Sequence, residues 1–173
     1  MQGQHDTALN ARGRLQAAEA ARRLAPLAPD LGALDFVASP LARTRETMDI
    51  LLRSVGLAAG RYRSDPGFAE LSFGSWEGRT WKELRKLDPA RYALRERDRW
   101  SFTPPGGESY ATLAVRVAGA LQVLSRDSAL VSHGGVARAL LTMLCGLPAR
   151  EAIRASIWQG QVLVFQDGRH RWA

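Results

Sequence analysis

A buried strand over residues 129–132 runs straight into the tripeptide His133-Gly134-Gly135 and then into a helical pattern over 136–144. A strand over 34–38 is followed in the same way by helical periodicity from residue 41. When each strand leads into a helix, the strands run largely parallel and the helices cover both faces of the sheet. The sequence therefore predicts a three-layer α/β fold with a mostly parallel sheet.

The other predicted elements continue this alternation but leave the sheet short of strands. Helical patterns are predicted over about 10–25, 81–87 and 109–124, and a last strand over 162–165 precedes the turn at Asp167-Gly168. That makes three strands, whereas open sheets usually have about four to six. Because the chain begins on a loop and a helix, we expect a first strand to be missing.

Length and composition are those of one globular domain over residues 1–173. Hydrophobic residues make up 46% of the chain, and no uncharged apolar run approaches the roughly 18 residues that cross a bilayer. Residues 1–14 lack the basic start and apolar segment of a secretory signal. We expect a cytoplasmic protein without a membrane partner, and the sequence carries no signal for its oligomeric state.

The formal net charge of +7 comes from arginine, because Lys82 and Lys86 are the only lysines among 24 basic residues. The arginines are dispersed, with no run of five and no interleaved aromatic platform. This pattern argues against nucleic acid as a partner. It favours a solvated arginine-rich surface that attracts small anions.

Arg43 follows the first strand-to-helix junction and lies just inside the predicted helix. A guanidinium offers a fork of donors that matches phosphate, and the start of a helix adds positive potential. An arginine in a first helical turn is more often simply exposed to solvent. Position alone therefore favours the structural interpretation of Arg43 over the functional one.

His133 lies at the second junction, where two glycines open a helix. Gly134 and Gly135 let backbone N–H groups approach an anion, and a protonated His133 would add charge and a proton. A histidine bonded to nearby backbone is the alternative, but the strand–His–Gly–Gly–helix context favours function. Ligands bind beyond the carboxyl ends of strands in open α/β sheets, so we expect His133 and Arg43 to face one site.

Glu70 lies in an acidic and aromatic loop over residues 68–78. A carboxyl near desolvating side chains and a second anion has a raised pKa, which suits a general acid for a leaving alkoxide. A surface carboxylate is an equally weighted interpretation of the same position.

Five segments, taken together and in order, resemble the histidine phosphatase superfamily, also called the phosphoglycerate mutase-like family. They are Gln2-Gly3-Gln4-His5-Asp6, Ser39-Pro40-Leu41-Ala42-Arg43, Glu70 with Trp76-Glu77-Gly78, Pro105-Gly106-Gly107-Glu108-Ser109, and Ser132-His133-Gly134-Gly135. Any one of these segments would be modest evidence. Five in the right order, spread through nearly the whole chain, make the resemblance strong.

The resemblance implies a phosphoglycerate mutase-like fold and phosphoryl transfer through a phosphohistidine, without a metal or other cofactor. By position, Arg43 is implied to bind phosphate, His133 to stabilise it, and Glu70 to donate the proton, with a backbone contact from Gly134. The implied partner is a small phosphorylated metabolite. In such chemistry an imidazole attacks phosphorus in line while cationic groups offset the equatorial charge.

The family nucleophile is the one part of the pattern without a counterpart, because it lies in an Arg-His-Gly motif upstream of the Gln-Gly segment. Here Met1 immediately precedes Gln2, His5 lacks the motif's context, and His170 lies in a terminal Arg-His-Arg cluster. We therefore expect an N-terminally incomplete domain that is inactive without its nucleophile. Met1 is then an internal residue or misassigned start of a longer gene, or else the chain is a truncated, non-catalytic anion-binding module.

The connection over residues 100–109 bears on the choice between phosphatase and mutase. It is short, whereas phosphoglycerate mutases typically carry a longer basic, proline-rich insertion there. We therefore expect a phosphomonoesterase that hydrolyses a small phosphate ester, with phosphoglycerate mutase-type transfer as the alternative. The substrate is not specified, because Trp76, Trp81 and Trp100 could shape the pocket or serve as core aromatics.

Overall fold

The structure, a computed structural model, describes all of residues 1–173, and its main sheet has three parallel strands. They are β1 (Asp35–Ala38), β2 (Arg63–Ser64) and β3 (Ser128–Val131), in the spatial order β2-β1-β3. Phe36 on β1 lies opposite Ala129 on β3. The two strands expected before the helices are therefore parallel neighbours, whereas the two-residue β2 was too short to predict.

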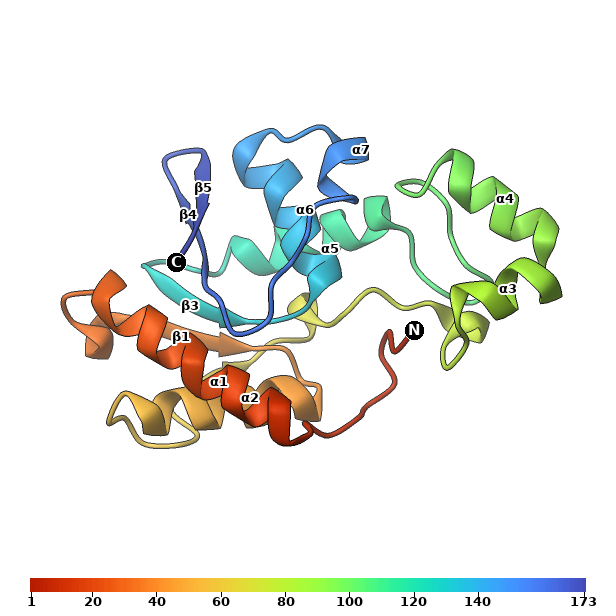
Figure 1. The fold of residues 1–173 in the computed structure, drawn as a ribbon. Helices are drawn as coiled ribbons and strands as arrows, with labels where there is room; N and C mark the ends of the chain where they lie inside the picture. The colour runs from red at the N-terminus through yellow and green to blue at the C-terminus, as the bar shows by residue number, and fades with distance from the viewer.

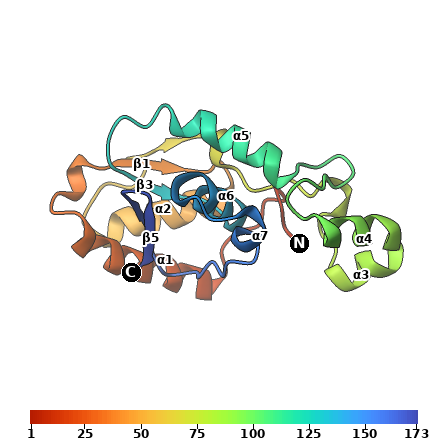
Figure 2. The same cartoon turned by 90° about the horizontal axis from the view of Figure 1, so that it is seen from above.

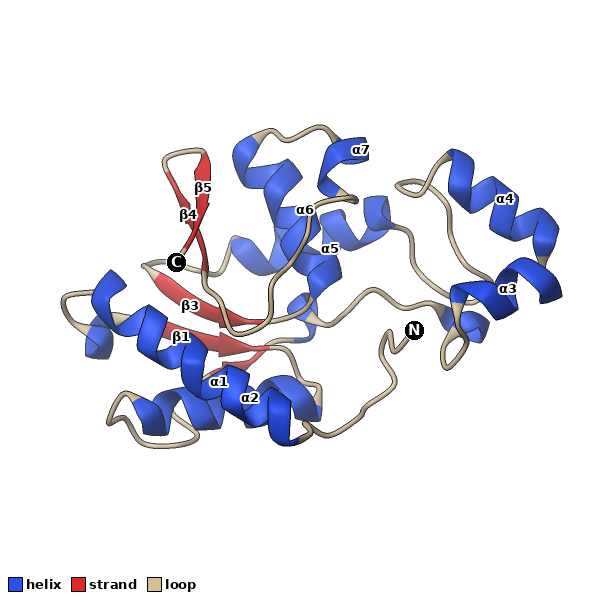
Figure 3. Ribbon diagram, in the orientation of Figure 1, coloured by secondary structure: helices blue, strands red, loops and turns tan.

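Helices cover both faces of this sheet, as Figures 1 and 3 show. One face carries α1 (Ala11–Leu24) and α2 (Ala42–Ser54), and the other carries α5 (Tyr110–Leu121) and α6 (Gly134–Cys145). Successive side chains of β1 enter different cores, because a strand alternates its faces. Phe36 packs with the core under α1 and α2, and Val37 packs with the core under α5 and α6. The predicted three-layer arrangement is confirmed.

Local signals place the helix starts close to where the sequence predicts them. The Asn10 side chain accepts a hydrogen bond from the Gly13 amide and so caps α1. Ser109 caps α5 in the same way, through the amide of Thr112. The α6 helix ends at Gly146, whose φ of 65° is the left-handed conformation that glycine adopts readily.

The remaining helices lie outside the layered core. They are α3 (Trp81–Leu87), α4 (Pro89–Arg97) and α7 (Ala149–Ala152), with short 3₁₀ turns at Ala25–Leu27, Leu31–Ala33, Pro66–Phe68 and Gly74–Trp76. Figure 2 shows α3 and α4 as a pair that projects beyond one end of the sheet. None of the helices has the length and apolar character needed to span a membrane.

The last two strands form a hairpin of their own. Antiparallel β4 (Leu163–Gln166) and β5 (Arg169–Trp172) are joined at the predicted turn Asp167-Gly168, whereas β5 itself was not predicted. The hairpin is not hydrogen-bonded to β3 (Figure 1), although Val162 packs against one core and Phe165 against the other. One edge of β3 is consequently free, and β3 is less buried than the sequence led us to expect.

Candidate phosphate site

Arg43 and His133 meet at the carboxyl ends of β1 and β3. Arg43 is the second residue of α2, which follows β1, and His133 is the N-cap residue of α6, which follows β3. Arg43 Nη2 lies 3.3 Å from His133 Nδ1, although 90 positions separate the two residues. Parallel neighbouring strands bring their following residues to one end of the sheet, so the expected convergence is observed.

The two nitrogens of the His133 ring have different partners. Arginine has only donors, so Nδ1 accepts from Arg43 and the ring proton lies on Nε2. Nε2 lies 2.7 Å from the hydroxyl of Ser39, a fully buried residue directly after β1. The sequence placed Ser39 in a motif but gave it no role; its hydroxyl accepts from Nε2 and fixes the orientation of the ring, while Arg43 selects the tautomer.

Burial changes the ionisation of His133. It lowers the pKa of the ring to about 3, and the guanidinium groups of Arg43 and Arg116 act in the same direction. The His133 ring is therefore neutral in the chain without a bound anion. A phosphate dianion would offset these positive charges and favour protonation of the ring.

This ionisation gives a prediction for stability. We expect His133→Gln to lose less stability than the parent chain when the pH falls from about 7.5 to about 5. The folded-state pKa lies below the ordinary 6.5, so on acidification the unfolded chain takes up the proton first and unfolding becomes easier. Between these two pH values the parent chain should lose about 2 kcal/mol more of its free energy of unfolding than His133→Gln does. Urea unfolding of both proteins at both pH values measures this difference.

Glu70 works in the opposite direction, because burial raises its pKa and the folded chain holds that proton more tightly. Both proteins in the comparison retain Glu70, so its contribution cancels. An equal loss of stability in the two proteins would mean that His133 titrates normally in the folded chain.

The N-terminal loop lies across Arg43. Arg43 Nη1 donates to the carbonyl of His5 over 2.9 Å, and Nη2 donates to the carbonyl of Gly3 over 2.8 Å. The Asp6 carboxylate accepts from the amide of Ala42 over 2.8 Å, at the start of α2. The resemblance pointed to this loop without giving its contacts, which orient the guanidinium of Arg43.

Glu70 lies beside the start of α6 and not at the free surface. Its Oε1 accepts from the amides of Leu71 and Gly135, over 2.8 and 3.0 Å. Burial raises the pKa of Glu70, against the lowering effect of these N–H groups and of Arg43 and Arg138. The surface interpretation of Glu70 is therefore wrong.

The two glycines after His133 have separate reasons to be glycine. A Cβ at Gly135 would overlap the carboxylate of Glu70, so the close approach of Glu70 depends on that residue. The amide of Gly134 has no acceptor within the protein, which leaves the first N–H group of α6 free. Gly134 thus presents an unpaired donor, whereas the amide of Gly135, which the sequence also offered to an anion, is bonded to Glu70.

A second carboxylate, Glu77, joins the N-terminal loop to the loop of Glu70. Its Oε1 accepts from the amides of Gln4 and Phe73, each over 3.0 Å. The Gln4 side chain donates to the carbonyl of Glu70 over 3.0 Å. Glu77 therefore holds the site's two loops together, and its charge also acts on Arg43.

The aromatic candidates have different surroundings. Trp76 is buried and stacks on Phe102, with ring centroids 5.3 Å apart, so it is a core residue. Trp100 stacks on Tyr110 at 5.9 Å, and the guanidinium of Arg95 lies 3.8 Å from the centre of the Trp81 ring. Of these three tryptophans, Trp76 alone is identified as a core residue.

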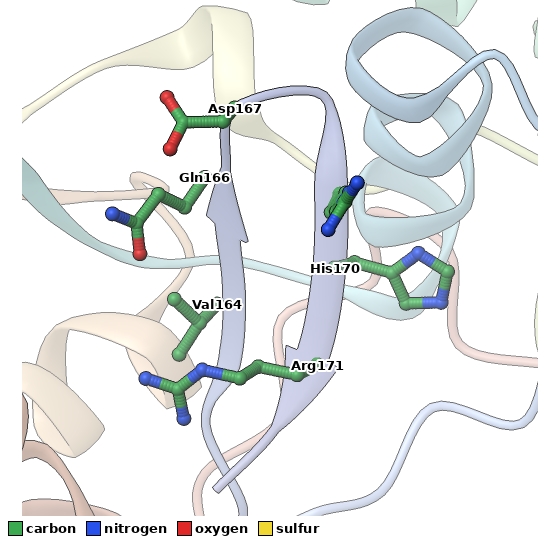
Figure 4. A pocket seen from close by; sticks show the side chains of 6 residues that line it. Val164, Gln166, Asp167, His170 and Arg171 are labelled. Carbon is green, nitrogen blue, oxygen red and sulfur yellow. The ribbon is translucent and has the colours of Figure 1, made fainter.

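The other two histidines differ in position. His5 is exposed, and only its backbone carbonyl is bonded to Arg43. His170 belongs to β5, beside a cavity of about 490 Å³ lined by Val164, Gln166, Asp167, Arg169, His170 and Arg171. Figure 4 shows the His170 ring on the opposite side of the hairpin from Gln166 and Asp167. No predicted site residue lines this cavity, so it is separate from the Arg43–His133 junction.

The family model of the histidine phosphatase superfamily (branch 1) matches residues 1–173. The chain belongs to this superfamily, whose members here are phosphatases and phosphoglycerate mutase-like proteins. A glucosyl-3-phosphoglycerate phosphatase of Mycolicibacterium vanbaalenii is 37% identical over an alignment of 162 residues, and the alignment covers 86% of this chain and 68% of that protein. An Erwinia tasmaniensis protein with the name "Probable phosphoglycerate mutase GpmB" is 34% identical over an alignment of 155 residues, with the same coverage.

Solved structures agree with this assignment. The mycobacterial glucosyl-3-phosphoglycerate phosphatase in complex with inorganic phosphate has a TM-score of 0.76 and 29% identity, over 100% of this chain and 88% of that one. The α-ribazole phosphatase of Shigella flexneri has a TM-score of 0.79 and 26% identity, over 98% and 84%. The phosphoglycerate mutase-like fold predicted from the motifs is confirmed.

Proposed function

We propose that residues 1–173 carry the phosphate-binding and proton-donating part of a phosphomonoesterase that works through a phosphohistidine and hydrolyses a small phosphate ester. The observation that carries this proposal is the 3.3 Å approach of Arg43 to His133 beside the free amide of Gly134. A guanidinium, an imidazole and a helix start together favour a phosphoryl group. We also propose that these residues form one domain of a cytoplasmic protein and that its partner is a small molecule.

In this proposal Arg43, His133 and Gly134 bind the phosphoryl oxygens. Arg43 is held by backbone carbonyls, and His133 is held by Ser39, so neither side chain has to be ordered when the ester binds. Donors fixed in this way are most effective where negative charge develops during transfer. Once the dianion is present, His133 takes up a proton on Nδ1, and Nδ1 then donates to a phosphoryl oxygen in place of its contact with Arg43.

Glu70 is the proposed proton donor to the leaving oxygen. Oε1 already accepts from two amides at 3.0 Å or less, whereas Oε2 lies 3.4 Å from the Gly135 amide. Oε2 makes only this longer contact, so it is the oxygen that we propose carries the proton. The raised pKa of Glu70 keeps more of the carboxyl protonated near neutral pH, as a general acid requires.

The attacking histidine is the part that these residues do not provide in the site. His133 is assigned to binding the phosphoryl group, and the ring of His170 lies on the separate hairpin. We expect a strand that pairs with the free edge of β3 to bring the nucleophile beside His133. Without it, Arg43 and His133 would still bind anions, which is the non-catalytic alternative.

Hydrolysis is preferred to mutase-type transfer because of the short 100–109 connection, which packs Phe102 on Trp76 and Trp100 on Tyr110. The relatives include proteins with both kinds of name, so phosphoryl transfer to a second substrate is the alternative. A panel of phosphate esters, assayed for free phosphate and for transferred phosphate, distinguishes the two. Release of free phosphate as the main product is the expected result.

We expect Arg43→Ala to weaken the binding of orthovanadate by about 1.5 to 3 kcal/mol, because a bond between a charged donor and an anion is lost. Titration calorimetry on the purified chain measures the change. Arg45→Ala is the matched control, since Arg45 is exposed on the same helix and should leave affinity unchanged. Equal affinities in the Arg43→Ala and parent proteins would remove Arg43 from the site.

A further inference from the structure

Arg138 reaches the start of α6 from the helix's second turn. Its Nη1 lies 3.0 Å from the position that a Cβ on Gly134 would occupy. Glu70 approaches the same helix start at Gly135 and interacts electrostatically with Arg138. Arg138 is therefore a neighbour of the proposed phosphate position, although it belongs to none of the motifs in the sequence.

The charge of Arg138 is not neutralised by the protein. Arg116, by contrast, makes two bonds to the Glu108 carboxylate, over 3.0 and 2.7 Å, and Arg95 pairs with Glu96 over 2.6 Å. No carboxylate lies within ion-pair distance of Arg138, whose Nε donates to the carbonyl of Ala155 over 3.2 Å. A half-buried guanidinium of this kind gains most from an external anion.

Tyr110 adds a hydroxyl beside this guanidinium. It is the first residue of α5, and its ring is fixed by the stack on Trp100 at 5.9 Å. Burial raises the pKa of Tyr110, against the lowering effect of the nearby Arg138 charge, so the hydroxyl remains a protonated donor at neutral pH. Guanidinium and hydroxyl together form a donor set suited to a carboxylate.

We propose that Arg138, with Tyr110, is a specificity-determining pair that binds a carboxylate on the substrate, a short spacer away from the phosphate held by Arg43, His133 and Gly134. This inference rests on the proposed function, because it assumes that the phosphoryl group occupies that junction. It restricts the substrate class to phosphate esters with a second negative charge. Esters of the same size with a neutral end lose the contact with Arg138.

The test compares 3-phosphoglycerate with glycerol 3-phosphate, which differ in a carboxylate against a hydroxymethyl group. Titration calorimetry on the purified chain should give a preference of about tenfold or more for 3-phosphoglycerate. In Arg138→Gln that preference should disappear through weaker binding of 3-phosphoglycerate, with glycerol 3-phosphate changed less than about twofold. Arg150→Gln, which removes an exposed charge from nearby α7, is the control and should keep the preference.

Tyr110→Phe removes one hydroxyl from the stacked ring and decides the case if Arg138→Gln fails to fold. It should lower the preference for 3-phosphoglycerate over glycerol 3-phosphate, by a smaller factor than Arg138→Gln does. Equal weakening of both esters in the two variants, or no preference in the parent chain, would overturn the role of Arg138 and Tyr110. Failure of the proposed function is a different result, in which neither ester binds and Arg43→Ala changes nothing.

Discussion

Residues 1–173 expressed alone are expected to show negligible turnover of a chromogenic phosphate ester and no phosphohistidine. A version preceded by an apolar strand and Arg-His-Gly should gain both. Positive charge from Arg43 and donors at α6 stabilise a transition state but do not replace the attacking group, so the difference should span orders of magnitude. The measurement is a phosphate-release assay together with detection of acid-labile phosphohistidine.

The short chain should also aggregate more readily than the extended one, because the free edge of β3 leaves hydrogen-bonding groups unpaired. A variant of the extended protein with Ala in place of the motif histidine controls for this. It should fold like the extended protein and remain inactive. Robust turnover by residues 1–173 that disappears in His5→Ala would make His5 the nucleophile instead.

Glu70→Gln in the extended protein should slow turnover by about 10² to 10⁴ for esters with poor leaving groups. Gln keeps an oxygen for the amides of Leu71 and Gly135 but has no proton for the leaving alkoxide. Esters of acidic phenols depart without protonation, so their rates should change little. A plot of kcat against the leaving-group pKa, for both proteins, measures the difference.

Glu77→Gln is the matched control, because Glu77 holds the amides of Gln4 and Phe73 and makes no hydrogen bond to the start of α6. Any effect of Glu77→Gln should be uniform across the leaving groups. A uniform effect of Glu70→Gln would assign Glu70 to binding and remove it from proton transfer.

The two strand-to-helix junctions were predictable because their sequence signals are local. An apolar strand that leads into a helix start identifies β1 with Arg43 and β3 with His133, and the parallel sheet then brings them together. The free edge of β3 and the separate hairpin depend on which strands pair across long distances. No short stretch of sequence contains that information.

The electrostatic state of the site was not predictable for a related reason. The pKa of His133 depends on its burial and on Arg116, which lies in a different helix, α5, outside the motifs. Arg138 and Tyr110 likewise meet only because α5 and α6 pack together. A motif identifies the residues that a site must contain, whereas charge and specificity arise from the residues packed around them.

The most direct test of the phosphate site is a crystal structure of this chain with orthovanadate. The predicted result is vanadate bonded to the guanidinium of Arg43, the ring of His133 and the amide of Gly134. Vanadate held only by the basic hairpin residues Arg169, His170 and Arg171, with an empty Arg43–His133 junction, would contradict the proposal.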